Sequence, residues 1–284
     1  MKHNSKVLVS IGIPFYNSEA YLDFAIRSVL NQTYTHWQLF LLDDGSHDSS
    51  LSIAKKYQSD PRVTVVSDGL NKGLPARLNE LSLLAEGKYY ARMDADDIMF
   101  PNRIETQVKF LEENPNLDVL GCCAISIDTQ NNIVGKRNCQ KKNGFSKYEI
   151  IQNGCFIHPS VMGKRSWFVK NTYNIEYRRS QDLELWMRTV DSSDFHVLDE
   201  PMIFYREVGV PTFKKYYQSV RVVLSIYNKY MDRKRVLFYF KLVLKLLIYF
   251  LFYVAKQTDF LIKKRSENLS NTSDYYDILH RSTL

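Results

Sequence analysis

Three carboxylates lie within four residues, at Asp94, Asp96 and Asp97, directly after the apolar and aromatic run 88–91. A D-x-D triplet alone is a weak signal, because a chain of this length contains one by chance with a probability of roughly one half. Its position adds information, since run 88–91 has the pattern of a short strand and ligands of open α/β sheets bind at the carboxyl ends of strands. Alternate residues of an extended segment project to one side, so Asp94 and Asp96 can offer hard oxygen ligands to Mn²⁺ or Mg²⁺.

Two further acids stand where elements begin or end. Asp44 follows the apolar run 37–42 and precedes Gly45 and Ser46; it can accept a hydrogen bond from the edge of a base, or it can belong to a plain turn, which Asp and Gly favour. Asp182 opens a segment with helical periodicity. A carboxylate in a first helical turn is favoured by the helix dipole, so a capping role stands beside a role in proton transfer.

The elements around these acids alternate between strand and helix. Residues 7–14 form a compact apolar run rich in β-branched residues, which is typical of a buried parallel strand, and Ser18 is the expected N-cap of the helix that follows. The remaining expected elements are helix 19–31, strand 37–42, helix 49–58, strand 63–67, helix 75–85 and a hairpin over 117–134. This alternation predicts an α/β fold with a mostly parallel sheet and right-handed crossovers.

The first strand is not followed by a glycine-rich loop. A dinucleotide-binding unit places G-x-G-x-x-G there, and this chain has only Gly12, inside the strand. A Walker loop is also absent, so a bound nucleotide must be held by side chains and a metal. His158 precedes Pro159, which predicts an extended backbone at that point; a contact with an acceptor and simple packing remain equally open for its ring.

Several motifs in order carry a family resemblance. They are Ile13-Pro14-Phe15-Tyr16-Asn17, Asp43-Asp44-Gly45-Ser46, Asn71-Lys72-Gly73-Leu74 with Arg77-Leu78-Asn79, Ala91 to Asp97 followed by Pro101 and Arg103, His158-Pro159-Ser160-Val161-Met162, and Gln181-Asp182-Leu183-Glu184-Leu185-Trp186. Over residues 6–206 the sequence resembles the family 2 glycosyltransferases of bacterial surface-glycan type. The resemblance implies an inverting enzyme of the GT-A (Rossmann-like) fold, in which a mostly parallel sheet is flanked by helices.

The resemblance also implies roles for individual residues. Asp182 is the implied catalytic base, Asp96 and Asp94 the metal ligands, and a divalent ion, Mn²⁺ or Mg²⁺, the cofactor. The implied contacts to a nucleotide-sugar, with UDP expected, are Pro14, Tyr16, Asn17, Asp44, Arg77, Asp94, Ala95 and Asp96, and the implied acceptor or phosphate contacts are His158, Gln181 and Arg206. Two departures stand out: Gln181 replaces a Glu that many members carry, and Glu207 follows Arg206 where relatives often have a His shortly after.

The net charge of +7 is concentrated in the C-terminal part of the chain. Residues 203–284 contain 15 Lys and Arg against 6 Asp and Glu, whereas residues 1–202 are slightly acidic. A basic segment beside apolar residues indicates that the binding partner is an anionic membrane surface or a nucleic acid. We expect the first partner and not the second, because a long apolar run accompanies the charge. The expected organisation is a catalytic domain, 1–206, and a basic, helical, membrane-associated region, 207–284.

The run 236–255 is interrupted only by Lys241 and Lys245. Twenty residues are enough to cross a bilayer. At 100° per residue, Lys234, Lys241, Lys245, Lys256 and Lys263 fall within an arc of roughly 60°. This stripe favours a helix lying in the headgroup region over a tilted span with two costly central lysines, and packing on the catalytic domain is the third possibility. Residues 266–284 are polar and expected to be loosely ordered.

The resemblance, together with the basic apolar tail, implies transfer of one sugar from a nucleotide-sugar to a lipid-linked or cell-surface glycan. The N-terminus shows no signal-peptide pattern, which places the expected site of action at the cytoplasmic face of the cell membrane, with a peripheral, monotopic or single-span attachment. The alternative is a module of the same fold that binds nucleotide-sugar or recruits to membranes without catalysis.

Overall fold

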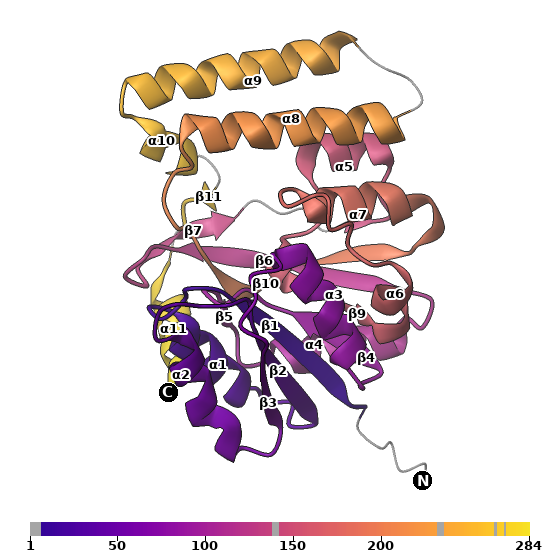
Figure 1. Ribbon diagram of the computed structural model, residues 1–284, viewed down its shortest axis with the longest axis vertical. Coiled ribbons are helices and arrows are strands. Elements are labelled where there is room, and N and C mark those ends of the chain that lie inside the picture. Colours follow the sequence, from indigo (N-terminus) through magenta and orange to yellow (C-terminus); the bar gives the residue numbers. More distant parts are fainter. Residues whose placement is uncertain (1–6, 138–141, 232–235, 264–265, 270) are drawn as a thin grey trace.

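A computed structural model of the chain describes residues 7–137, 142–231, 236–263, 266–269 and 271–284. Its centre is a twisted mixed sheet with helices on both faces, and two long helices, α8 and α9, run side by side as an additional layer at one end (Figure 1). The expected α/β fold with a helical C-terminal part is therefore observed.

The strands, with their bounds, are β1 (Val9–Phe15), β2 (Trp37–Asp43), β3 (Val63–Ser67), β4 (Tyr89–Arg92), β5 (Ile98–Met99), β6 (Val119–Ile127), β7 (Ile133–Arg137), β8 (Lys142–Asn143), β9 (Met162–Lys164), β10 (Phe195–Arg206) and β11 (Ser266–Glu267). The α-helices are α1 (Leu22–Leu30), α2 (Ser50–Lys55), α3 (Leu74–Leu84), α4 (Arg103–Glu113), α5 (Lys147–Asn153), α6 (Arg165–Lys170), α7 (Gln181–Thr189), α8 (Phe213–Tyr230), α9 (Val236–Val254), α10 (Thr258–Lys263) and α11 (Ser273–Thr283).

The sheet has a parallel half and a mixed half. Strands β3, β2, β1 and β4 lie side by side and parallel. Beyond β4 the order continues through β9, β6, β7 and β11 with antiparallel pairs, while β10 runs parallel to β6. The carboxyl ends of β1, β2 and β4 therefore meet at one edge, which is where the acidic motifs were expected to gather.

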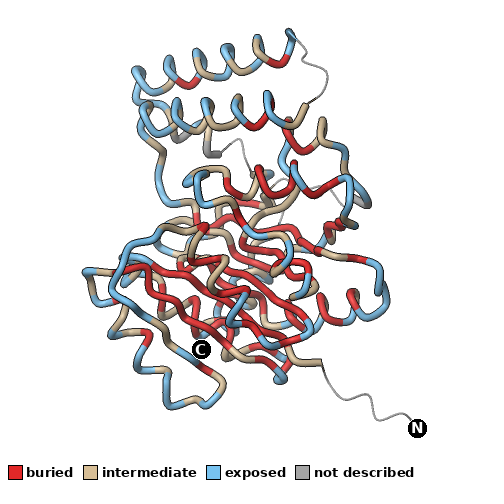
Figure 2. Tube along the Cα trace, turned by 45° about the vertical axis from the view of Figure 1, so that its right-hand side comes forward, coloured by how far each residue is buried: buried red, intermediate tan, exposed pale blue. Residues whose placement is uncertain are grey.

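Buried apolar residues occupy both faces of the sheet. Every residue of β1 is buried, as expected for a strand covered by helices on both sides. One apolar cluster packs β1 and β2 against α1 and α4, and another packs the opposite face against α3, α6 and α7. In Figure 2 buried residues follow the strands, whereas the outer helix of the α8–α9 layer is largely exposed. The site at the strand ends is thus attached to a rigid core.

Three local expectations are wrong. The helix after β1 starts at Leu22 and its N-cap is Tyr21, because the hydroxyl of Ser18 turns back to donate to the carbonyl of Tyr16 and cannot cap. His158 begins a short 3₁₀-helix, since a proline at its second position is compatible with the first helical turn. The helix after β1 is also shorter than expected, whereas the helical segment after β2 covers residues 50–59, close to the expected range, and ends in a 3₁₀ turn.

The last part of the chain is not loosely ordered. β11 pairs with β7, and α11 packs on α1 with Leu279 buried. The side chain of Asn31 in α1 donates to the carbonyl of Ser282 at 3.2 Å. The expected C-terminal region therefore does not form one unit: α8 and α9 form a separate layer, and residues 271–284 pack back on α1.

α9 is the one helix of the described residues that is long and apolar enough to cross a membrane, by length and composition alone. It contacts α8 through stacked rings, Tyr227 on Phe238 and Tyr216 on Tyr249, with centroids 3.8 Å apart in each pair. Only 11% of its most apolar window is buried. Packing on the catalytic domain therefore does not account for its composition.

Candidate active site

The turn after β1 is locked to the turn after β2. The amide of Asn17 donates to the hydroxyl of Ser46 at 3.1 Å, and the side-chain oxygen of Asn17 accepts from the amide of His47 at 2.8 Å. Asn17 has a positive φ of 47°, a conformation that Asn tolerates better than most residues. Pro14 lies in β1, and the ring of Tyr16 is 45% exposed at this edge. The predicted base-binding residues thus share one surface.

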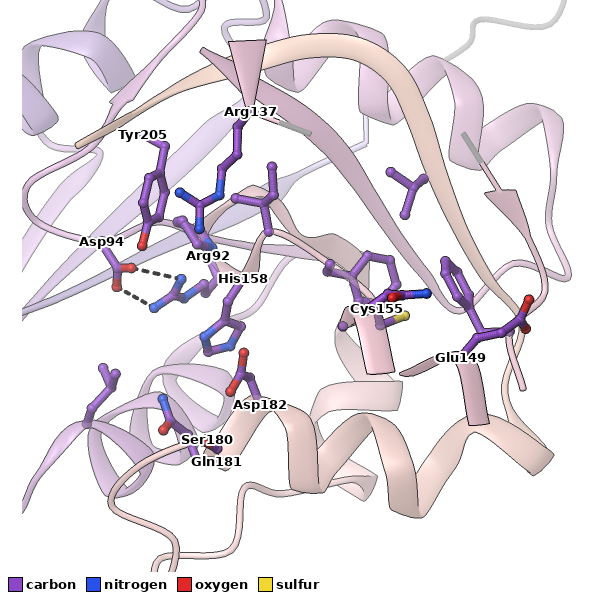
Figure 3. A pocket seen from close by; sticks show the side chains of 18 residues that line it. Arg92, Asp94, Arg137, Glu149, Cys155, His158, Ser180, Gln181, Asp182 and Tyr205 are labelled. Carbon is purple, nitrogen blue, oxygen red and sulfur yellow. Dashed lines mark hydrogen bonds and ion pairs between the residues drawn. The ribbon is translucent and has the colours of Figure 1, made fainter. Parts of the chain in front are cut away.

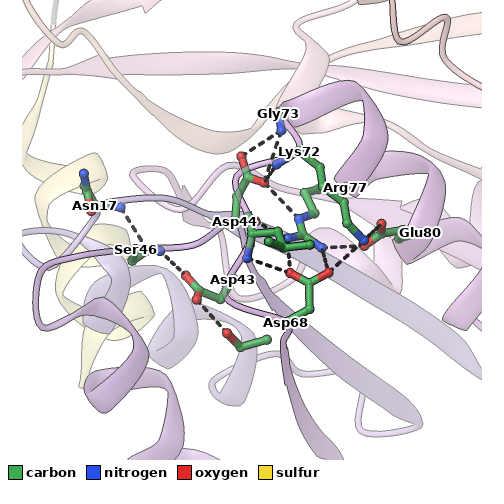
Figure 4. A network of polar contacts seen from close by, with 11 residues as sticks. Asn17, Asp43, Asp44, Ser46, Asp68, Lys72, Gly73, Arg77 and Glu80 are labelled. Carbon is green, nitrogen blue, oxygen red and sulfur yellow. Dashed lines mark hydrogen bonds and ion pairs between the residues drawn. The ribbon is translucent and has the colours of Figure 1, made fainter.

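Asp44 is held from three sides at the end of β2 (Figure 4). Its carboxylate accepts from the amide of Lys72 at 2.8 Å, from the amide of Gly73 at 3.1 Å and from Nε of Arg77 at 2.9 Å. Gly73 has a φ of 87°, which a residue with a side chain adopts only with strain, so the loop before α3 can wrap the carboxylate closely. The carboxylate is consequently fixed in orientation.

Arg77 is held by acceptors of the protein itself. Its side chain is 1% exposed and its guanidinium donates to Asp44, Asp68, Glu80 and the carbonyl of Leu70. Burial acts to lower the pKa of Arg77, but the hydrogen bonds to Asp68, Glu80 and Asp44 outweigh it, so the pKa is raised and the charge is permanent. Arg77 therefore supports Asp44, and its expected contact with the nucleotide-sugar remains a prediction.

The second acidic cluster lies between β4 and β5. One carboxylate oxygen from each of Asp94, Asp96 and Asp97 lies within 4.8 Å of the others. Asp97 is 1% exposed, and one of its oxygens accepts from the amide of Arg206 at 2.9 Å. Its other oxygen, Oδ2, has no hydrogen-bond partner among the described residues. Ala95 packs its methyl group into the core, so only its backbone can meet a ligand.

This cluster fits a divalent cation. Burial and the neighbouring Asp94 raise the pKa of Asp96 to about 6. Burial and then Asp96 and Asp94 raise the pKa of Asp97 well above its usual value. The charges of Arg92 and Arg206 oppose these shifts only in part, so the carboxylates still repel each other, and one oxygen of Asp97 has no partner among the described residues. Asp94 and Asp96, which are half-buried, are the residues that would hold Mn²⁺ or Mg²⁺. Asp97 is more deeply buried and shapes the turn.

One cavity of about 790 Å³ joins the acidic cluster to α7 (Figure 3). Arg92, Asp94, His158, Gln181 and Asp182 all line it. Arg92 is fully buried and forms an ion pair with Asp94 through both Nη atoms. Figure 3 shows the carboxylate of Asp182 directed toward the same space from the start of α7. The structure therefore brings Asp94 and Asp182 into one cavity, although they are far apart in the sequence.

α7 is anchored on both sides. Ser180, which precedes it, has a left-handed backbone with a φ of 51°. Glu184, one turn into the helix, accepts from the hydroxyl of Tyr230 in α8 at 2.5 Å and pairs with Arg188. Burial raises the pKa of Asp182, and the amide of Leu183 and the charge of Arg92 oppose this shift. A carboxylate with a raised pKa in a cavity has the chemistry of a general base.

His158 is half-buried beside this base. Its Nε2 is 2.8 Å from the hydroxyl of Tyr173, and burial, with the charge of Arg92, keeps its pKa well below 6.5. The ring is therefore neutral at physiological pH. Gln181 is buried in the first turn of α7 and lines the cavity. Both residues are in reach of an acceptor that enters the cavity.

Arg206 is tied to the protein itself. Nε donates to the carbonyl of Asp96 at 2.7 Å, Nη1 to the carbonyl of Asp128 and Nη2 to the side chain of Asn131. The residue is only 3% exposed. Arg206 therefore fixes the backbone of the acidic cluster, and its expected contact with phosphate remains a prediction.

The cavity contains residues that the sequence motifs did not single out. Arg137 from β7 and Tyr205 from β10 cover its upper side, and Phe145 and Phe156 line the end near α5. Tyr205 adjoins a motif residue in sequence and could have been found there. Arg137 is the last residue of β7 and lies in a polar stretch of the sequence without strong periodicity, so no motif marks it.

Comparisons with known proteins agree with the geometry. The family described as Glycosyl transferase family 2 matches residues 10–172. The putative glycosyltransferase EpsE of Bacillus subtilis is 36% identical over 194 residues, covering 66% of this chain and 68% of that protein. A glucosyltransferase of Escherichia coli, WfgD, named as acting from UDP-Glc on a GlcNAc-diphosphoundecaprenol, is 29% identical over 195 residues, covering 68% and 73%.

Solved structures share the fold. TarS of S. aureus, solved with UDP-GlcNAc, superposes with a TM-score of 0.61 at 17% identity, covering 96% of this chain and 79% of that one. A mannosyltransferase of Pyrobaculum calidifontis, solved with GDP-Man and Mn²⁺, has a TM-score of 0.60 at 15% identity, covering 87% and 70%. At these identities the likeness concerns the fold, which is of the GT-A type.

Proposed function

The chain belongs to glycosyl transferase family 2 and is a glycosyltransferase, and we propose that it is an inverting enzyme that moves a single sugar from a UDP-sugar to a lipid-linked or cell-surface glycan acceptor. The observation that carries the proposal is the shared cavity, in which Asp182 faces the space beside Asp94. The names of WfgD and TarS, which mention UDP-sugars, support the choice of donor.

In this proposal the donor side uses the edge formed by β1, β2 and β4. Asp44, fixed by Arg77 and two amides, accepts a hydrogen bond from the uracil, while Pro14 and Tyr16 pack around the base. Asn17 shapes the turn that holds them. A divalent ion held by Asp94 and Asp96 would act as a Lewis acid toward the diphosphate. Arg92 orients Asp94 through its ion pair.

Asp182 performs the proton transfer. It takes the proton of the acceptor hydroxyl while that oxygen attacks the anomeric carbon from the face opposite the diphosphate. The bond from the anomeric carbon to the diphosphate oxygen breaks, the electron pair leaves with the nucleoside diphosphate, and the configuration inverts. General-base catalysis contributes about 10²–10⁴-fold. His158 and Gln181, on either side of Asp182, orient the acceptor.

Release of UDP tests this proposal. The purified chain with Mn²⁺ is offered a panel of UDP-sugars with lipid-linked and glycan acceptors, and we expect turnover with one donor. Asp182→Asn, which keeps the shape of the side chain, is expected to lose about 10²–10⁴-fold in kcat while it still binds UDP. Turnover by this variant at the wild-type rate would remove Asp182 as the base.

We further propose that the chain works at the cytoplasmic face of the membrane, with α9 lying flat in the headgroup region. Counted at 100° per residue, the side of α9 that faces away from α8 carries only apolar residues, which are 43% to 83% exposed: Val236, Phe240, Val243, Leu244, Leu247, Leu251 and Val254. On the same count Lys241 adjoins this face and Lys245 lies farther round toward α8, and both are exposed. This arrangement suits anionic headgroups at the border of an inserted apolar face.

The neighbour of α9 favours the interfacial placement over a span. α8 lies alongside it and exposes Lys214, Lys215, Arg221 and Lys229, which would adjoin hydrocarbon if α9 crossed the bilayer. Lys234 and the side chain of Lys263, which complete the predicted stripe, lie outside the described residues. We expect the chain to sediment with vesicles that contain anionic lipid and to be released by alkaline carbonate. If the chain stays with the vesicles after carbonate treatment, α9 spans the bilayer. If the chain does not sediment with the vesicles, the proposed membrane attachment is wrong.

A further inference from the structure

Arg137 is a cation of the cavity that neither the sequence motifs nor the donor site uses. It is the last residue of β7 and pairs in register with Ala124 of β6 and Ser266 of β11. Figure 3 shows its guanidinium descending from the strand beside Tyr205 and above Arg92. The side chain is 23% exposed and lines the same cavity as Asp94 and Asp182.

Two contacts hold this guanidinium in a fixed plane. Nη1 donates to the carboxylate of Glu207, which is 9% exposed and also accepts from the hydroxyl of Ser126 at 3.3 Å. The guanidinium carbon lies 4.3 Å from the ring centroid of Tyr205. A carboxylate on one edge and an aromatic ring on one face pre-orient the group. Nε and Nη2 of Arg137 have no hydrogen bond to another described residue.

The other arginines near the cavity differ from Arg137 in their exposure and in the partners of their guanidinium groups. Arg92 is fully buried and its Nη atoms are occupied by Asp94, and Arg206 is 3% exposed with three acceptors from the protein. Of the described residues that line the cavity, Arg137 alone combines a permanent charge with accessible donors. A planar guanidinium with two free donors matches two oxygens of a phosphate group.

We propose that Arg137 binds a phosphate group of a diphosphate substrate and so contributes to substrate specificity. The proposal rests on the proposed function, because the ligand belongs to the same transfer reaction. A diphosphate can come from two sources: the donor nucleotide-sugar, or the diphosphate that links an acceptor sugar to its lipid carrier. Both diphosphates offer the same kind of phosphate oxygens to Arg137. The assay distinguishes them by comparing an acceptor that carries a diphosphate with one that does not.

The test compares the full chain with Arg137→Met and Arg137→Lys. Arg62→Met is a matched control, because Arg62 also stacks on an aromatic ring, 3.8 Å from the centroid of Trp37, and also pairs with a carboxylate, that of Asp60, but outside the cavity. Two acceptors carry the same sugar, one on a prenyl diphosphate and one on a neutral alkyl chain of equal length. The Kd of UDP with Mn²⁺ is measured by calorimetry, and KM is measured for the donor and for each acceptor.

Loss of a charge-assisted bidentate contact is expected to raise one of these constants by about 10- to 100-fold in Arg137→Met, with Arg137→Lys in between. A higher Kd for UDP and a higher donor KM assign the donor diphosphate. A higher KM for the prenyl diphosphate acceptor alone assigns the acceptor diphosphate. Constants equal to those of Arg62→Met, or an equal rise with both acceptors at an unchanged Kd for UDP, would overturn the proposal.

The folded state of each variant is checked by its thermal midpoint, and Arg137→Lys keeps the test valid if Arg137→Met is unstable. The outcome is separable from that of the proposed function. If the wild-type chain neither binds UDP nor transfers sugar, the proposed function fails. If the wild-type chain does both and Arg137→Met does so equally well, only the role of Arg137 fails.

Discussion

Two acidic clusters stand at the carboxyl ends of strands in the parallel half of the sheet, and they are built in opposite ways. Around Asp44, the negative charge is matched by a buried arginine and by backbone amides, and Arg77 is bound on every side. Around Asp96 and Asp97, burial and mutual repulsion raise the pKa values, and one buried oxygen has no partner among the described residues. The first cluster is complete in the protein alone, and the second is suited to receive a cation.

This difference gives a rule for reading the site. An acid whose charge is already compensated contributes a fixed hydrogen-bond acceptor, and its removal is expected to cost stability. An acid whose charge is uncompensated contributes affinity for a cation, and its removal is expected to cost activity while it relieves repulsion. The predictions below test each side of that contrast.

The largest effect is expected for Asp96→Asn. If Asp96 holds the metal, its loss removes a Lewis acid that contributes several kcal/mol, so kcat is expected to fall on the order of a thousandfold. The free energy of unfolding is expected to stay equal or to rise, because a repelling charge has gone. UDP release and urea unfolding measure the two quantities. A variant that is much less stable than the wild type would show that the second cluster is structural, like the first.

Arg77→Met is expected to show the converse pattern. Removing the arginine leaves Asp44 buried without its cation, and breaking a buried ion network by deleting one partner costs about 3–5 kcal/mol. Urea unfolding at constant slope m gives this value. Arg62→Met, which breaks an exposed pair with Asp60, is the control and is expected to change stability by less than about 1 kcal/mol. Equal effects of the two substitutions would contradict the special role of the Asp44 cluster.

The sequence shows where both acidic clusters lie, but it does not show which of them has its charge compensated. The apolar runs placed β1, β2 and β3 nearly to the residue, and the position of each acid at a strand end followed from them. What could not be seen is which acids have cationic partners. Arg77 meets Asp44 and Asp68 only because the loop before α3 folds over the end of β2, whereas Glu80 lies three residues farther along the same helix.

Contacts between segments that are distant in the sequence explain the other differences between the prediction and the structure. Arg137 reaches the cavity because β7 pairs with β6, and no local pattern marks it. The docking of α11 on α1 depends on a short apolar stripe, Tyr275, Ile278 and Leu279, that polar neighbours obscure in the sequence. Local periodicity predicts elements, whereas charge pairing and end-to-end docking arise only when the elements assemble.

A smaller effect is expected from metal binding itself. Mn²⁺ at a hundred times its Kd is expected to stabilise the folded chain by about 2.7 kcal/mol, because the ion binds the folded state and not the unfolded one. The thermal midpoint with and without Mn²⁺ measures this shift. Asp96→Asn is expected to lose the shift, and Arg62→Met to keep it. A shift that persists in Asp96→Asn would move the ion away from this cluster.

The smallest effect is expected from a change of pH, and it concerns a third acid, Asp182. Burial raises the pKa of Asp182, so the group keeps its proton to a higher pH than an ordinary aspartate, whose pKa is about 3.9. Because the base must be ionised to accept a proton, kcat at saturating Mn²⁺ is expected to fall as the pH drops through this raised pKa, and to be level above it.

The midpoint of that acid limb identifies the group responsible. Burial and the charge of Arg92 lower the pKa of His158 well below 6.5, and His158 is not the proposed base, so His158→Gln is expected to leave the midpoint in place even if it changes KM. Asp182→Glu, which keeps a carboxylate but moves it, is expected to lower kcat and to shift the midpoint. If His158→Gln moved the midpoint and Asp182→Glu did not, the proton transfer would belong to the histidine side of the cavity, and Asp182 would join Asp44 among the acids that serve the structure.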